Sequence, residues 1–179
     1  MKISRYIQHL SLLGSSPGRS ASIKRILIMA TTYNRNQLAD VFKTYGVNPS
    51  TLFLLDSEYV YLDHASAPAF FSAISSQVIT ILKGWKKEFC DCDKFSRVVQ
   101  SIAQVAHATQ WADQNSKPAA LAMAVFNYIK PGEGGHSINC IVTKEDGIDK
   151  FHIRFFEPQT AKEVLLSPKE ANSAFMVLL

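Results

Sequence analysis

The chain has 179 residues, of which 47% are hydrophobic and 19% carry a charge. This composition is that of a folded domain rather than a disordered chain, and no apolar run reaches the roughly 20 residues that a membrane span needs. The formal net charge of +4 arises in residues 1–28, which hold five basic side chains and no acidic one. The rest of the chain is close to neutral, which argues against a basic surface for nucleic acid.

Residues 1–28 are rich in serine as well as basic. Organelle transit peptides have this composition, whereas a secretory signal would need a continuous apolar segment. We expect a flexible N-terminal extension over 1–28, with a targeting segment as the alternative, followed by a single domain over 29–179. Three cysteines, Cys90, Cys92 and Cys140, make an odd number, which argues for a reducing, cytoplasmic compartment rather than a disulfide framework.

The first half of the chain has helical spacing of its apolar residues. This spacing predicts one helix within 34–47 and another within 67–85, with extended segments over 51–63 between them. A third helix is predicted to begin at Cys92, because apolar residues recur at helical spacing from there and Asp91 is a favourable N-cap.

The period changes in the second half. Residues 120–129, 136–143 and 151–158 are typical of strands, the last two with alternating apolar and polar positions. Helices followed by an antiparallel sheet predict an α+β fold.

The last two predicted strands are joined by a segment that contains Asp146–Gly147, a preferred type I′ turn. A two-residue turn there would place Cys140 opposite Ile153 and His136 opposite Glu157. Directly opposed side chains have Cβ atoms about 5 Å apart, so the imidazole could reach the carboxylate.

A carboxylate on one imidazole nitrogen fixes the tautomer and stabilises the imidazolium, so the other nitrogen can take a proton from a thiol. Cys92 at a helix start would have its thiolate stabilised by backbone N–H groups and the helix dipole. Together with His136 and Glu157 it would form a Cys–His–acid nucleophilic site, with Cys92 on the helical stripe that faces the His–Glu pair.

Three short motifs, "CDKF", "GHSIN" and "FFEPQT", occur in this order within residues 85–160. They resemble the papain-like cysteine protease domain at the C-terminus of the fairy-ring mushroom (Marasmius) agglutinin, and similar small bacterial and phage proteins. The resemblance implies a papain-like fold over about 35–165. It also implies Cys92 as nucleophile, His136 as general base and Glu157 as the orienting carboxylate.

The same resemblance suggests supporting roles for Gln159, Asn139 and Gly135. The fungal domain is activated by calcium, which here would lie at Asp91 and Asp93; no other cofactor is expected. In papain-like enzymes a glutamine about six residues before the cysteine often serves the oxyanion hole, and here Lys86 stands at that position.

The preferred function is therefore a thiol hydrolase, a peptidase of peptide or protein substrates that works through an acyl-enzyme. Two alternatives stay open. One is transglutaminase-like or amidase acyl transfer on the same three residues. The other is a non-catalytic binding or inhibitory module, encoded by a phage or a bacterium, that retains the fold.

Other chemistries fit the sequence less well. Cys90, Cys92 and His136 offer three zinc ligands, whereas structural zinc sites take four, typically in two spaced pairs. A thioredoxin-like redox site would need C-x-x-C. The glycine-rich segment 132–135 has no Lys-Ser/Thr after it, so it is not a phosphate loop.

Overall fold

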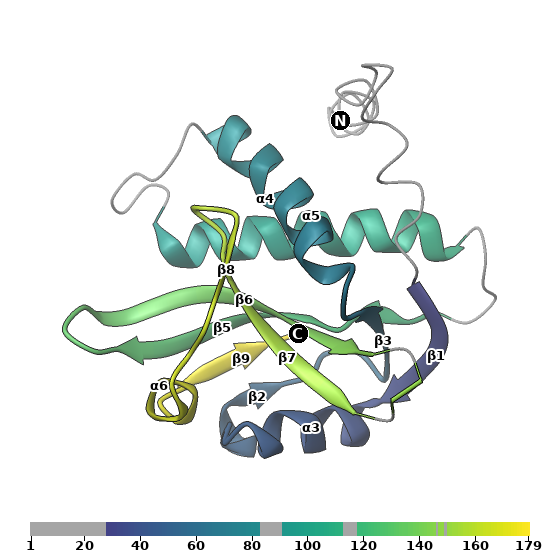
Figure 1. Cartoon of the computed structure of the whole chain (residues 1–179), viewed down its shortest axis with the longest axis horizontal. Coiled ribbons are helices and arrows are strands. Elements are labelled where there is room, and N and C mark those ends of the chain that lie inside the picture. The colour runs from purple at the N-terminus through teal and green to yellow at the C-terminus, as the bar shows by residue number, and fades with distance from the viewer. Residues whose placement is uncertain (1–27, 83–90, 113–117, 146, 149) are drawn as a thin grey trace.

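The computed structural model describes residues 28–82, 91–112, 118–145, 147–148 and 150–179 (Figure 1). No helix within these ranges is long and apolar enough to cross a membrane. The elements in chain order are β1 (Ile28–Asn34), α3 (Arg35–Thr44), the short 3-10 helix η1 (Pro49–Thr51), β2 (Leu52–Phe53), β3 (Glu58–Asp63), α4 (Ala67–Leu82), α5 (Cys92–Ala112), β4 (Ala120–Leu121), β5 (Met123–Lys130), β6 (Gly134–Lys144), β7 (Phe151–Glu157), β8 (Lys162–Val164), α6 (Pro168–Asn172) and β9 (Met176–Leu178).

The strands form one mixed sheet in which β6 is central. One edge of β6 pairs antiparallel with β5 and then, at its far end, parallel with β3. The other edge pairs antiparallel with β7, which continues to β8. The sheet is extended by β1 beside β3 and by β9 and β2 beyond β5.

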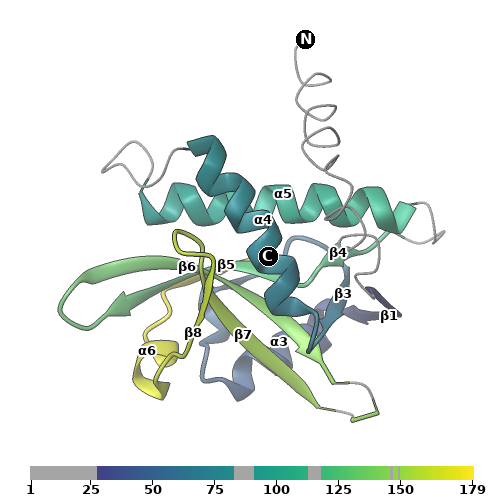
Figure 2. The same cartoon turned by 45° about the horizontal axis from the view of Figure 1, so that its top comes forward.

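Helices cover both faces of this sheet. In Figure 1, α4 and α5 lie above it and α3 lies below it, and Figure 2 shows α4 crossing α5 on the same side. Buried side chains of α4 and α5 pack with Met123, Ile141 and Phe156. On the other face, α3 packs with the alternate positions of the same strands, among them Phe126 and Ile138. This alternation is the period-two pattern of strands that are buried on both faces.

A polar stripe fastens α5 to backbone groups of the sheet. From Gln100, Nε2 donates to the carbonyl oxygens of Met123 and Leu178, at 3.0 and 2.9 Å. One turn later, Gln104 both donates to and accepts from Leu121. His107 Nε2 lies 2.9 Å from the carbonyl oxygen of Ala119. These contacts fix the position of α5 along the sheet.

The three predicted helices are confirmed, and the third begins at Cys92 as expected. The predicted antiparallel pairs are present, but the sheet is mixed, because β1, β2 and β3 also join it and several of its pairs are parallel. Residues 1–27 and 83–90, which include the N-terminal extension, Lys86 and Cys90, lie outside the described residues.

The predicted register between β6 and β7 is also wrong, by two residues. Cys140 lies opposite Phe155 rather than Ile153, because residues 145–150 form a longer connection than a two-residue turn. A shift of two leaves every side chain on the face expected for it. Gly147 has a positive φ of 76°, and Asp146 lies outside the described residues.

Candidate active site

His136 and Glu157 meet at one end of the β6–β7 pair. The two residues come from the third position of β6 and the last position of β7. His136 Nε2 lies 2.8 Å from Glu157 Oε2, and the side chains are only 15% and 17% exposed. A hydrogen bond of this length between imidazole and carboxylate, shielded from water, fixes the orientation of the ring.

The carboxylate of Glu157 is itself held in place by the segment that follows it. The backbone N–H of Gln159 donates to Glu157 Oε1 at 3.3 Å. Between these residues, the carbonyl of Pro158 accepts a hydrogen bond from the hydroxyl of Ser75 on α4. Ser75 is fully buried, so α4 anchors the end of β7 from the other side of the sheet.

Glu157 is hydrogen-bonded to Nε2 of His136, so Nδ1 is the nitrogen that remains for a reacting group. Nδ1 makes no hydrogen bond to any residue that the structure describes. If Nε2 carries the hydrogen that Glu157 accepts, Nδ1 holds the lone pair of the neutral ring. The hydrogen bond to Glu157 therefore defines Nδ1 as the nitrogen of His136 that can accept a proton.

The ring of Tyr128 packs beside the imidazole of His136. It lies directly opposite His136 in the β5–β6 pair, and the two rings are in edge contact with centroids 5.8 Å apart. Burial raises the pKa of Tyr128 to about 12, and electrostatic interactions with Glu170, Glu157, Glu133 and Cys92 add to the shift. The phenol is thus neutral at physiological pH, and it lies within the electrostatic reach of both Glu157 and Cys92.

Cys92 is the first residue of α5 and is half-buried. The helix begins there because the carbonyl of Asp91 accepts the backbone N–H of Phe95 at 2.9 Å. The hydroxyl of Ser96 donates to the carbonyl of Cys92 at 2.7 Å, and the side-chain amide of Asn139 on β6 donates to the carbonyl of Ser96 at 3.0 Å. The first turn of α5 is therefore tied to β6.

The thiol itself makes no hydrogen bond to His136 or to another described residue. In Figure 1, α5 and β6 run in the same direction, so a step back from the Ser96–Asn139 contact leads to Cys92 on the helix and His136 on the strand. The thiol of Cys92 and the imidazole of His136 are thus at the same end of the helix–strand pair.

The helical stripe of Cys92 does not face the His–Glu pair as expected. Phe95 and Val99 pack with Ile141 on one face of β6, whereas His136 belongs to the opposite face with Ile138. The stripe therefore packs on the sheet behind the imidazole.

The two acids beside Cys92 lie close to each other and to a base. Lys94 Nζ lies 3.1 Å from Asp91 Oδ1 and 3.9 Å from Asp93 Oδ1. The side chain of Asp93, and then the hydrogen bond that Lys94 donates, lower the pKa of Asp91. Calcium takes six to eight oxygen ligands. The described residues provide two carboxylates here, and an ammonium group already contacts both.

The three expected supporting residues are placed differently from one another. Gln159 supports Glu157 through its backbone, and its side-chain nitrogen is buried with no hydrogen-bond partner among the described residues. Asn139 is fully buried and fastens β6 to α5. Gly135 is exposed, and a Cβ there would meet only the ring of Phe175, at 3.9 Å. Of the three, Gln159 and Gly135 are neighbours of the His–Glu pair along the chain.

Cys140 lies far inside the fold. It is fully buried between β5 and β7, and burial raises the pKa of its thiol well above the ordinary range. Within the described residues, Cys92 is therefore the thiol that a reagent in solution can reach. Neither Tyr128 nor Ser75 was among the expected site residues. The position of Tyr128 opposite His136 could have been predicted by pairing the two strands on either side of the glycine-rich turn. Nothing in the sequence around Ser75 indicates its contact with Pro158.

The molecule is an α+β domain whose helices pack on a curled mixed sheet, and the fold resembles the papain-like domain of PSL1a. PSL1a in complex with E64 matches with a TM-score of 0.58 and 21% sequence identity, over 83% of this chain and 51% of that chain. The predicted α+β, papain-like fold class is confirmed by this similarity.

A lectin from Polyporus squamosus, solved with a human-type influenza-binding epitope, matches with a TM-score of 0.49 and 26% identity, over 72% of this chain and 42% of that chain. The chain thus spans about half the length of PSL1a and somewhat less of the lectin. No protein-family model matches the sequence, and no curated protein matches it.

Proposed function

We propose that the chain is a thiol hydrolase, a peptidase in which Cys92 is the nucleophile, His136 the general base and Glu157 the carboxylate that orients it. The observation that carries this proposal is the 2.8 Å hydrogen bond between His136 Nε2 and Glu157 Oε2 at the end of the helix–strand pair that bears Cys92. It leaves Nδ1 as the nitrogen that exchanges a proton with the thiol.

The proposed reaction begins when His136 Nδ1 takes the thiol proton of Cys92. The thiolate attacks the carbonyl carbon of an amide, a C–S bond forms and the carbonyl oxygen becomes an oxyanion. The C–N bond then breaks, and the imidazolium of His136 gives its proton to the leaving amine. Water, deprotonated by His136, hydrolyses the thioester and regenerates the thiol. Glu157 stabilises the imidazolium in both halves of the cycle.

The substrate class is inferred from the fold comparison. PSL1a was solved in complex with E64, a peptide-like inhibitor, which favours a peptide in the corresponding position of this chain. A Cβ at Gly134 would meet nothing within 4 Å, so a peptide backbone has room to approach the start of β6. Acyl transfer to an amine is the second candidate, because it uses the same thioester and differs only in the group that attacks it.

The decisive experiment measures how fast iodoacetamide labels each cysteine as a function of pH, with peptide mapping by mass spectrometry. We expect Cys92 to react at neutral pH, Cys140 to stay unlabelled, and His136→Ala to slow the labelling of Cys92 by roughly 10²-fold. His107→Gln is the matched control, since it removes an imidazole from the far end of α5 and keeps a donor for Ala119.

Equal slow labelling of Cys92 in the wild type and in His136→Ala would overturn the assignment of the base. If Cys92 is activated, incubation with E64 and with a peptide library separates the remaining functions. Peptide cleavage that Cys92→Ala abolishes identifies a peptidase. Amide exchange with an added amine, without net hydrolysis, identifies acyl transfer. A biological effect that survives Cys92→Ala identifies a binding module.

A further inference from the structure

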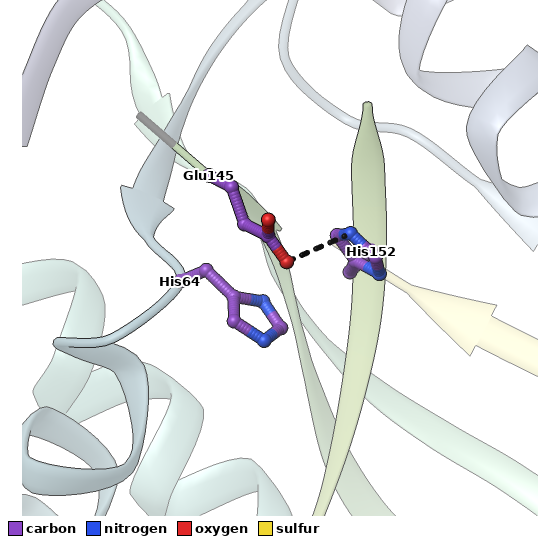
Figure 3. A group of neighbouring side chains, drawn as sticks. All are labelled: His64, Glu145 and His152. Atoms are coloured by element: carbon purple, nitrogen blue, oxygen red, sulfur yellow. Dashed lines mark ion pairs between the residues drawn. The ribbon is translucent and has the colours of Figure 1, made fainter. Parts of the chain in front are cut away.

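Three side chains of the metal-ligating type meet at the other end of β6, far from His136. His64 follows β3, Glu145 follows β6 and His152 is the second residue of β7. Figure 3 shows the three side chains converging from these segments. One ligand atom from each lies within 4.8 Å of the other two. His152 Nε2 and Glu145 Oε1 are 3.4 Å apart.

Thr143 is a hydrogen-bond partner of His64. If the hydroxyl of Thr143 donates to the carbonyl of His152, at 3.3 Å, its oxygen accepts from Nδ1–H of His64, at 2.9 Å. The lone pair of His64 is then on Nε2. A histidine whose second nitrogen donates to a fixed acceptor is the usual arrangement of a metal-bound imidazole.

Glu145 is the acidic member of the cluster, and its carboxylate can offset the charge of a bound cation. The guanidinium of Arg154, which donates to the carbonyl of His64, is also bound by both carboxylate oxygens of Glu163. Glu163 therefore pairs with Arg154, and Glu145 is left as the anionic group of the cluster.

We propose that His64, Glu145 and His152 bind a divalent transition metal ion of the zinc class, with a fourth coordination position open to water or an anion. Ligands on tetrahedral zinc at about 2.0–2.2 Å are about 3.4 Å from each other, which is the separation already present between His152 and Glu145. One ligand atom of His64 lies within 4.8 Å of those of the other two residues, so it has to approach by at most about 1.4 Å to reach this separation.

The bound ion would connect β3, β6 and β7 at the point where the β6–β7 connection begins. Eight residues of β6, or roughly 26 Å, separate this site from His136, so the ion would not touch the candidate active site. Its expected effect is on stability, since a ligand that binds only the folded chain raises the free energy of unfolding.

The test measures zinc binding to the full chain carrying Cys90→Ser and Cys92→Ser, which removes competing thiolates outside the buried core. Dialysis against zinc-buffered solutions should give one ion per chain at micromolar free zinc. His152→Gln and Glu145→Gln should each weaken binding by at least about 100-fold, and Thr143→Val by about 10-fold. Zinc should raise the melting temperature of the parent chain and leave that of His152→Gln unchanged.

His136→Gln is the control that separates this site from the candidate active site, and it should bind zinc as the parent chain does. Cobalt in the chain with all its cysteines should show visible d–d bands without thiolate charge transfer. Because Glu145 lies outside the strands, its variant remains informative if His152→Gln does not fold. Zinc affinity that both cluster variants retain, or that His136→Gln abolishes, would overturn the proposal, as would no binding by the parent chain.

Discussion

His136 and Glu157 are hydrogen-bonded although they do not face each other in the sheet. Carried to the end of β7, the observed register sets Glu157 opposite Ile138, so the imidazole and the carboxylate are diagonal neighbours. Diagonal positions are about 7–8 Å apart, which a histidine and a glutamate together can bridge. The hydrogen bond forms because the glutamate side chain is long enough to reach the imidazole from a diagonal position.

We expect Glu157→Gln to slow the labelling of Cys92 at neutral pH by roughly 10²-fold, because the amide cannot stabilise an imidazolium. The measurement is the pH profile of iodoacetamide labelling. Glu163→Gln on the neighbouring β8 is the matched control, since that carboxylate is occupied by Arg154. A profile of Glu157→Gln that superimposes on the wild type would show that the carboxylate does not orient the base.

Ser75→Ala should destabilise the fold by about 1–3 kcal/mol, because the buried carbonyl of Pro158 loses its donor. Urea unfolding measures this directly. Ser76→Ala on the same helix is the control, because its side chain is exposed and it should cost little. The labelling rate of Cys92 should also fall in Ser75→Ala, since Pro158 connects Glu157 to Gln159.

The stability of the fold should decrease as the pH falls below about 6.5. Burial lowers the pKa of His107, which is only 2% exposed, and the hydrogen bond to Ala119 offsets this only in part. The unfolded chain therefore takes up the proton first, so the stability present above pH 6.5 is lost as the pH falls through the pKa of the folded state.

Urea midpoints at pH 7.5 and 5.5 test this expectation. The wild type should lose up to about 1.4 kcal/mol per pH unit for one such histidine. His107→Gln should flatten the dependence, and His64→Gln should remove a further part, because the pKa of His64 is lowered too. An equal slope in the wild type and His107→Gln would assign the acid sensitivity to other groups.

Calcium should not accelerate the labelling of Cys92 in the wild type, because Lys94 already contacts Asp91 and Asp93. Lys94→Ala removes the ammonium group that offsets the negative charges of Asp91 and Asp93. An effect of calcium should therefore appear in that variant before it appears in the wild type. Calorimetric titration and the labelling rate, each with and without calcium, measure the two quantities. Activation of the wild type by micromolar calcium would refute this expectation.

The helices and the last three predicted strands follow from local spacing, and so does the α+β class. The register between β6 and β7 could not be predicted, because it depends on the length of the connection, and Asp146–Gly147 favoured a shorter one. The meeting of His136 with Glu157 survived the error, because a shift of two residues keeps both side chains on the same face.

The remaining features depend on contacts between distant segments. The parallel pairing of β3 with β6 has no local signature, and it is this pairing that brings His64 to Glu145. Only Glu145 and His152, which flank one connection, could have been associated from the sequence. Likewise, Gln100 and Gln104 look like ordinary surface residues of a helix until the strands beneath them are known.

The two members of the His–Glu pair differ in how firmly the sheet holds them. β6 is paired with β5 from Gly134 to Ile141, so His136 lies within this ladder, whose amide protons should exchange slowly with solvent. Glu157 is the last residue of β7, and its outer neighbour is the three-residue β8. Local opening of the chain would thus release the carboxylate while the imidazole keeps its place. A fluctuation of the β7–β8 edge, far too small to unfold the domain, would be enough to separate the imidazole of His136 from its carboxylate partner.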